Sequence, residues 1–143
     1  MLEMENEVRA CLEGEKQKSL KKVNSVTSME KALLCARVGA EFKALDLVLL
    51  DVSRFTSFAD FFVICSGKSS RQVQGIADNV EKSLRDHGIK PLGVEGRIEG
   101  QWILMDYGDV IIHIFYEPIR HFYDLESLWS EAKRVQWEEK IES

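Results

Sequence analysis

The segment Gly67-Lys68-Ser69 is the first part of the chain whose residue types could do chemistry. Between a strand and a helix, Gly-Lys-Ser can belong to a phosphate-binding loop, in which backbone amides surround the phosphates of a nucleotide. The complete motif needs a second glycine five residues before the Gly-Lys pair, and Phe62 occupies that position. We therefore favour a glycine turn that leads into an N-capped helix, whose free amides could attract an anion only weakly.

Four aspartates are a second candidate, because carboxylates on neighbouring strands can bind magnesium in nucleotidyl transferases. They are Asp51, Asp60, Asp106 and Asp109. A strand end or a turn, where three of them are expected, is also a common structural place for aspartate. The three histidines show no His-x-His or His-x-x-x-His spacing, which argues against a metal site. We predict no catalytic residue, metal or other cofactor, and keep a metal-dependent, nucleotidyltransferase-like enzyme as the alternative.

The segment from Val94 to Trp129 is both acidic and aromatic, which indicates binding rather than catalysis. Between Glu95 and Glu126 the net charge is −5, as large as that of the whole chain. The seven acids are Glu95, Glu99, Asp106, Asp109, Glu117, Asp124 and Glu126, and the two bases are Arg97 and Arg120. Such a surface suits docking on a basic protein. It suits nucleic acid poorly, because a phosphate backbone requires clustered lysine and arginine, so we expect no specific nucleic-acid contact.

Trp102 is the most informative single residue of this segment. By strand alternation, Trp102, Leu104 and Asp106 share one face of the sheet. Because an aspartate lies on that face, we predict that the face is partly open and that Trp102 is an exposed interaction hot spot. The alternative is a core tryptophan covered by a helix.

The residues that follow the last predicted strand divide between core and surface. Arg120 and Tyr123 either pair with nearby acids inside the fold or adjoin the binding surface, and the sequence leaves both readings open. We expect Phe122 and Trp129 in the core, as large apolar residues of a helical region. Trp137, which lies among polar residues, is expected to be peripheral.

The 143 residues suit one domain, and a charge of −5 argues against a nonspecific binder of nucleic acid or anionic membranes. We predict a polar extension at 1–26, a globular domain at 27–135 and a polar tail at 136–143. Three widely spaced cysteines indicate reduced thiols in a cytosol-like compartment. No stretch is apolar enough to span a membrane, and the acidic start does not resemble a signal peptide. We therefore expect a cytoplasmic protein.

The elements that position these residues follow from hydrophobic spacing and capping signals. A capping box at 27–30 should begin a helix with Met29, Leu33, Ala36 and Ala40 on its buried face. Val73, Ile76, Ala77, Val80 and Leu84 mark a second, amphipathic helix. The expected order is helix 28–43, strands 45–52 and 59–65, a helix from Ser70, strands 92–94, 102–105 and 110–115, and a last helix capped by Asp124 with Leu125, Leu128, Trp129 and Ala132 on one face. We predict an α/β fold, with a mixed sheet of about five strands and helices packed on it.

Several short motifs follow one another in a fixed order between about residues 29 and 130. They are Asp51-Val-Ser53; Ala59-Asp60-Phe-Phe-Val-Ile with Ser66-Gly67-x-Ser69-Ser70-Arg71-Gln72-Val73; Trp102-x-Leu104-x-Asp106-Tyr107-Gly108-Asp109-Val110; and Arg120-x-Phe122-Tyr123-x-Leu125-Glu126-x-Leu128-Trp129. Each is modest alone, but their shared order and spacing are specific. The chain resembles the ribosomal silencing factor family, also called the Iojap family.

This resemblance implies an α/β fold similar in shape to nucleotidyl transferases, without a known transferase activity. It implies a translational repressor that binds the large ribosomal subunit through ribosomal protein fourteen and sterically blocks joining of the small subunit. Some members look dimeric when free, so a homodimer is expected as well. By resemblance, the partner surface should involve Glu95, Trp102, Asp106, Arg120 and Tyr123. Ribosomal proteins are basic, so the acidic segment agrees with this partner in sign.

Overall fold

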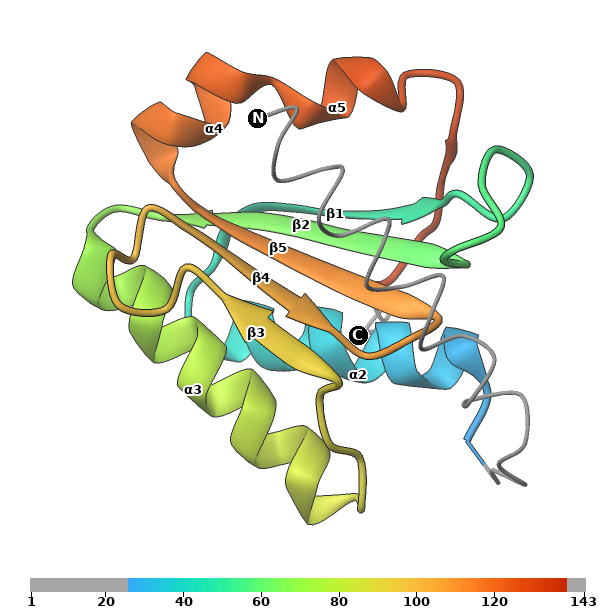
Figure 1. Cartoon of the computed structure of the whole chain (residues 1–143), viewed down its shortest axis with the longest axis horizontal. Helices are drawn as coiled ribbons and strands as arrows, with labels where there is room; N and C mark the ends of the chain where they lie inside the picture. Colours follow the sequence, from blue (N-terminus) through green and yellow to red (C-terminus); the bar gives the residue numbers. More distant parts are fainter. Residues whose placement is uncertain (1–25, 139–143) are drawn as a thin grey trace, which may run out of the picture.

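A six-stranded sheet with helices on both faces makes up the computed structural model, which describes residues 26–138 (Figure 1). Helices α2 (Ser28–Glu41) and α3 (Ser70–Asp86) cover one face, and α4 (Glu117–Tyr123) and the short α5 (Leu125–Leu128) cover the other. The strands are β1 (Leu45–Asp51), β2 (Phe61–Gly67), β3 (Gly93–Glu95), β4 (Trp102–Asp106), β5 (Val110–Tyr116) and β6 (Lys133–Arg134). The predicted α/β class with a mixed sheet is confirmed. Apart from Val26, the predicted extension at 1–26 lies outside the described residues.

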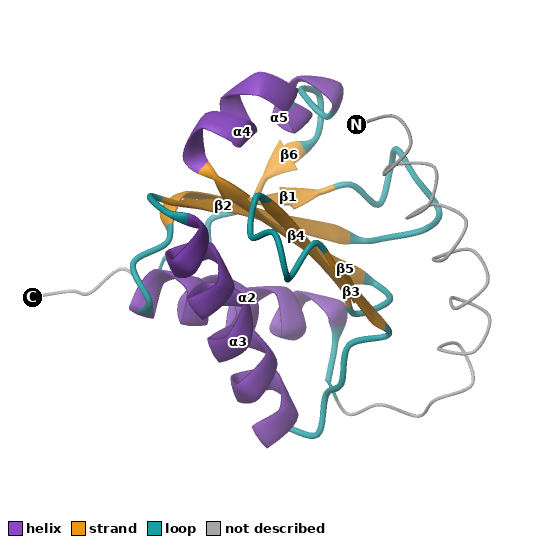
Figure 2. Ribbon diagram, turned by 60° about the vertical axis from the view of Figure 1, so that its left-hand side comes forward, coloured by secondary structure: helices purple, strands orange, loops and turns teal. Residues whose placement is uncertain are grey.

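The strands lie in the order β3-β4-β5-β2-β1-β6. Figure 2 shows the sheet between α2 and α3 on one face and α4 and α5 on the other. Among the described strands, β2 and β5 are parallel neighbours, and the other adjacent pairs are antiparallel. From β2 the chain continues to α3 on one face, whereas from β5 it continues to α4 on the opposite face. The carboxyl ends of these two strands, where Gly67 pairs with Tyr116, therefore form a topological switch point.

Local sequence signals account for the first two helices. Thr27 accepts a hydrogen bond from the Glu30 amide at 3.1 Å, and Ser69 accepts one from the Gln72 amide at 3.1 Å. Both predicted N-caps are thus confirmed. The Gln72 side chain accepts from the Lys68 amide at 2.7 Å.

The buried face of α2 differs from the predicted one. Met29 and Ala40 are exposed, and the helix instead buries Lys31, Ala32, Cys35, Ala36, Val38 and Gly39. Lys31 is tolerated there because its ammonium donates to Asp109 at 2.7 Å and to the Tyr107 carbonyl at 3.2 Å. This partly buried ion pair ties α2 to the β4–β5 turn and engages Asp109, one of the four candidate metal-binding aspartates.

Two hydrophobic cores lie on either side of the sheet. One packs the sheet against α2 and α3, with Cys65, Ile76 and Met105 among its members, and the other packs it against α4 and α5. Strands β2 and β4 are buried along their whole length, which explains why they appear in the sequence as continuous apolar runs. Burial raises the pKa of the Cys65 thiol to about 12, so this cysteine is an inert core residue.

The C-terminal part departs most from expectation. The predicted last helix ends at Leu128, which is exposed, and Asp124 adopts a left-handed backbone (φ 47°) without capping α5 through its side chain. The chain then forms β6, a sixth strand beyond the predicted five, which pairs with β1. Trp137 is half-buried rather than peripheral, and its indole donates to the Leu47 carbonyl at 3.3 Å. No helix within residues 26–138 is long and apolar enough to cross a membrane.

Candidate functional site

Trp102 lies inside an aromatic cluster between β4 and α4, so the prediction that it is exposed is wrong. Only 7% of its surface is accessible. Its ring stacks on Phe115 at a centroid distance of 4.8 Å, and Tyr123 of α4 packs on it at 5.2 Å. The helix that follows β5 therefore covers the face that Asp106 had suggested was open, and the alternative of a core tryptophan is confirmed.

His113 completes this cluster from β5. The Trp102 indole donates to its Nδ1 at 3.2 Å, so the proton of the neutral ring is on Nε2, which is buried without a hydrogen-bond partner. Burial lowers the pKa of His113 to about 3 from its usual 6.5. The side chain therefore stays neutral at physiological pH and serves as an acceptor that orients Trp102.

Acidification is expected to destabilise the protein through His113. The unfolded chain takes up a proton as pH falls below 6.5, whereas the folded chain does so only near 3. The stability that neutral His113 contributes is fully present above pH 6.5. Below this pH, the free energy of unfolding falls by up to about 1.4 kcal/mol per pH unit. Urea unfolding at pH 7, 6 and 5 measures the slope. In His113→Gln, which keeps an acceptor for the indole but does not titrate, the slope should be shallower.

If the stability of the parent and that of His113→Gln fell equally with pH, His113 would not be the group responsible. Asp51 does not interfere, because the Ser53 hydroxyl lowers the pKa of its carboxyl from 3.8. The stability that Asp51 contributes is therefore lost only at pH values below this window.

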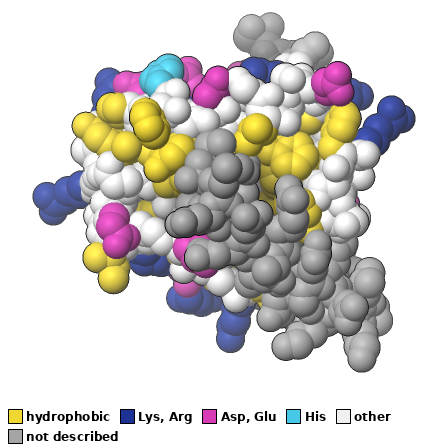
Figure 3. All heavy atoms as spheres, turned by 45° about the horizontal axis from the view of Figure 1, so that its top comes forward, with side chains coloured by type: hydrophobic (Ala, Val, Ile, Leu, Met, Phe, Trp, Pro, Cys, Tyr) yellow, Lys and Arg dark blue, Asp and Glu magenta, His cyan; other side chains and the backbone are white. Residues whose placement is uncertain are grey.

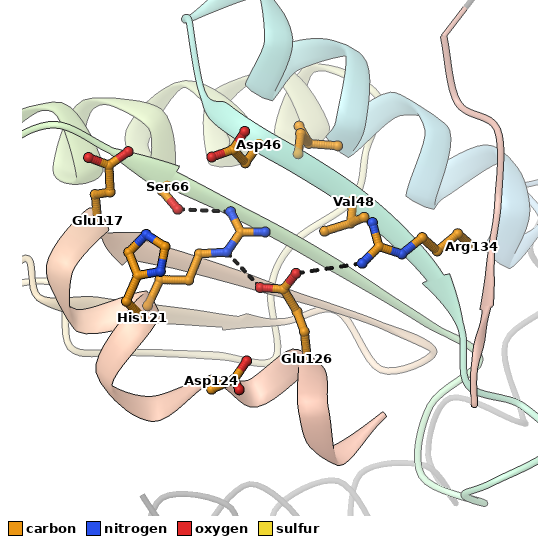
Figure 4. Close-up of a pocket in the computed structure, with 10 residues that line it drawn as sticks. Asp46, Val48, Ser66, Glu117, His121, Asp124, Glu126 and Arg134 are labelled. Atoms are coloured by element: carbon orange, nitrogen blue, oxygen red, sulfur yellow. Dashed lines mark hydrogen bonds and ion pairs between the residues drawn. The ribbon is translucent and has the colours of Figure 1, made fainter. Parts of the chain in front are cut away.

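Arg120 is also buried, in a polar cluster that joins three parts of the fold (Figure 4). Its Nε donates to Glu126 at 2.7 Å, and its Nη1 donates to the Ser66 hydroxyl at 2.8 Å and to the Leu45 carbonyl at 3.3 Å. Of the two readings left open, the internal pairing of Arg120 is the one observed. Tyr123, which packs on Trp102, is half-buried, so part of its side chain reaches the surface.

The other two predicted site residues lie apart. Asp106 is buried at the far end of β4, where its carboxylate accepts from the Gly108 amide at 2.7 Å and supports the tight turn. Glu95 is exposed on the edge strand β3, opposite Leu104, and so shares the sheet face on which α4 lies. The fold thus brings Trp102 and Tyr123 into contact, whereas Asp106 has a structural role.

Phe122 is the functional candidate that sequence reasoning missed. Expected in the core, it is 78% exposed on α4, with its ring against Tyr123 at 5.1 Å. Helical spacing carries the signal, because Ile119 and Tyr123 are one turn apart and face the sheet, which leaves Phe122 off the buried stripe. Figure 3 shows hydrophobic side chains gathered on this side of the molecule. Exposed apolar patches of this kind mark interaction sites.

The acidic character of the surface is weaker than the sequence suggested. Of the seven acids, Asp109 pairs with Lys31 and Glu126 with Arg120, while Asp106 and Asp124 accept hydrogen bonds at turns. Glu95, Glu99 and Glu117 form no ion pair within the described chain. Over residues 26–138, the structure has no group of three or more His, Cys, Asp or Glu side chains placed to hold a metal ion.

The fold and its candidate site define a small three-layer α/β protein with a solvent-facing aromatic surface on α4. A family model described as "Ribosomal silencing factor during starvation" matches residues 25–143, and the chain belongs to this family. A ribosomal silencing factor of Halalkalibacterium halodurans is 36% identical over 113 residues, which cover 79% of this chain and 97% of the relative. One of Bacillus subtilis is 40% identical over 90 residues, which cover 63% and 76%.

A solved structure agrees with the fold. The crystal structure of a protein from Chromobacterium violaceum superposes with a TM-score of 0.72 at 33% identity, over 73% of this chain and 88% of that chain. The likeness supports the three-layer architecture described above.

Proposed function

We propose that this protein is a translational repressor that binds the large ribosomal subunit through ribosomal protein fourteen and sterically blocks joining of the small subunit. Family membership and the names of the relatives support a ribosomal silencing role. The observation that carries the proposed contact is Phe122, a large aromatic side chain held in solvent on a helix whose other side is anchored in the core. Aromatic side chains in such positions commonly dominate the affinity of protein interfaces.

The predicted partner residues take different parts in this proposal. Phe122 and the exposed edge of Tyr123 make contact, and Glu95 adds negative charge on the same side of the sheet. Trp102 and Arg120 are positioning residues, because they hold α4 from below without being exposed themselves. The mechanism needs no catalysis, since a bound domain occupies space that the small subunit must enter. We expect the protein to act in the cytoplasm and to form a homodimer when it is free.

Phe122→Ala should lose binding to large subunits while keeping the parent fold. Truncation of an interface hot spot costs about 2 kcal/mol or more, so the affinity should fall about 30-fold. Cosedimentation with separated large subunits measures the affinity, and thermal unfolding checks the fold. Phe42→Ala is the matched control, because Phe42 is also an exposed aromatic residue, 42% accessible, at the end of α2 on the opposite face of the sheet.

Equal cosedimentation of Phe122→Ala and the parent would place the interface elsewhere. If the parent itself did not cosediment, the proposed function would be wrong. Raising the salt concentration should weaken binding only moderately, because most acids of the segment are already engaged inside the fold.

The enzyme alternative, a metal-dependent nucleotidyltransferase, finds less support in the geometry. Asp109 is paired with a lysine and Asp106 supports a turn, so neither carboxylate is poised as a metal ligand here. Calorimetry with ATP and magnesium tests this alternative, since saturable heat at millimolar ligand would favour it over the docking protein.

A further inference from the structure

A polar cavity of about 540 Å³ opens beside the Arg120 cluster and is not used by the proposed docking surface. It lies at the carboxyl ends of β2 and β5, the switch point where ligands of open α/β sheets commonly bind. Its size is in the usual range of small-molecule sites. The side chains that matter for its chemistry are Asp46, Ser66, Glu117, Arg120, Glu126 and Arg134.

Arg120 provides a hydrogen-bond donor without a partner. Within residues 26–138 its Nε and Nη1 make all of its hydrogen bonds and Nη2 donates to no atom, although more than nine-tenths of the residue is buried. In Figure 4, dashed lines mark the hydrogen bonds that Ser66 and Glu126 accept. Glu126 is shared with Arg134, whose guanidinium approaches it to only 3.9 Å. Two arginines around one carboxylate leave capacity to bind a second carboxylate, which a ligand can supply.

The carboxylates of the cavity supply negatively charged hydrogen-bond acceptors, the counterpart of the arginine donors. Among the described residues, the side chains of Asp46 and Glu117 form no ion pair or hydrogen bond, and that of Asp124 accepts only from the Ser127 hydroxyl. Four carboxylates and two arginines line the cavity, so its formal charge is −2 with histidine counted as neutral. Figure 4 shows Glu117 and His121 on one side of the view, Arg134 on the other and Glu126 between them.

The backbone fixes part of this arrangement. Asp46 has a positive φ of 48° at an irregularity in the pairing of β1 with β2. Irregularities of this kind redirect side chains next to binding sites. The left-handed conformation is unfavourable for a residue with a side chain, and aspartate and asparagine tolerate it best.

We propose that this cavity binds a free basic amino acid, such as arginine or lysine. The ligand carboxylate accepts from Arg120 Nη2 and from Arg134, and the α-ammonium and the cationic side chain donate to Asp46 and Glu117. A simple anion is disfavoured by the negative lining, and a simple cation leaves the Arg120 donor unused. An amino acid with a positive side chain satisfies both sides and offsets the net charge.

The test titrates the full-length, ¹⁵N-labelled protein with L-arginine to about 10 mM, which reveals millimolar affinities. We expect saturable amide shifts confined to β1, the end of β2 and α4, and a rise in Tm. Glu117→Gln and Asp46→Asn should each weaken binding about tenfold, by removing one charge-assisted hydrogen bond. Glu131→Gln, an exposed acid that lines another cavity, should leave the affinity unchanged.

Agmatine, which is arginine without its carboxylate, decides the role of Arg120. Weaker binding of agmatine than of L-arginine supports the proposal. Equal binding would overturn it in favour of a pocket for the cationic side chain of a protein partner. Absence of shifts, or shifts spread over all surface acids, would also overturn it. Because no ribosome is involved, these results are independent of the docking experiment with Phe122→Ala.

Discussion

Trp102→Ala is expected to lower the free energy of unfolding by about 3–5 kcal/mol, the usual cost of removing a buried aromatic side chain. The substitution removes the ring that stacks on Phe115 and supports Tyr123 from below. It also leaves the Nδ1 atom of His113 without its donor in a dry environment. Urea unfolding at pH 7 measures the loss. A domain of this size has only about 5–15 kcal/mol of stability, so much of the population could unfold at physiological temperature.

Two further variants separate packing from hydrogen bonding at this position. Trp102→Phe keeps an aromatic ring but loses the indole donor, so it should be destabilised by less than Trp102→Ala. Phe122→Ala should change stability by no more than about 0.5 kcal/mol, because its side chain is exposed. If Trp102→Ala were as stable as the parent, Tyr123 and α4 could not be resting on Trp102 as the structure shows.

This result would change how binding experiments are interpreted. An exposed hot spot, as strand alternation predicts for Trp102, could be truncated to alanine with loss of the partner and no loss of folding. In the structure the same variant disturbs α4, so a loss of ribosome binding would report on folding as much as on contact. Phe122 is the better probe, because it is 78% exposed and its ring lies against the neighbouring Tyr123 rather than in the core.

Local signals were sufficient for the parts of the fold that depend on nearby residues. The stripe from Val73 to Leu84 predicts α3, whose buried residues are those of the stripe. The glycine of the Asp106–Asp109 turn predicts the β4–β5 hairpin, and Gly108 has the positive φ of 88° that such a turn requires. These features rest on spacing and backbone conformation, which a short segment specifies by itself.

Local spacing and turn signals could not predict which residues of the candidate site are exposed. Whether Trp102 is buried depends on α4, which follows β5 and returns over the sheet. Asp106 on the same face suggested an open surface, but its carboxylate is satisfied by the adjacent turn and needs no solvent. Trp102, which was predicted to be exposed, is therefore buried, and Phe122, which was predicted to lie in the core, is exposed. Alternation identifies which residues share a face, but the packing of distant elements decides which face is covered.

The same limit applies to the C-terminal region. A helix with Leu128 and Trp129 on one face was expected from spacing, but the chain turns away and adds β6 to the sheet. A strand of two residues has no periodicity to detect, and its pairing with β1 spans more than 80 positions of the sequence. The internal pairing of Arg120 with Ser66 is likewise a long-range contact that the motif alone left undecided.

Arg120→Ala is expected to cost about 3–5 kcal/mol, as is usual when one partner of a buried ion pair is removed. The guanidinium joins α4 to Glu126, to Ser66 of β2 and to the Leu45 carbonyl at the start of β1. Its loss leaves Glu126 with the distant Arg134 and leaves a buried serine hydroxyl without its donor. Urea unfolding of Arg120→Ala and of Arg134→Ala measures the contrast. Arg134 is mostly exposed, so its removal should cost less than about 1 kcal/mol.

The double variant Arg120→Ala, Glu126→Gln tests the cause of this loss. If the unpaired, partly buried carboxylate of Glu126 is responsible, neutralising it should recover part of the stability, because the remaining cost is then that of lost packing and neutral hydrogen bonds. If instead Arg120→Ala and Arg134→Ala were equally mild, the Arg120 cluster would contribute little to holding α4. The positioning of Phe122 would then have to come from the Trp102–Tyr123 contact alone.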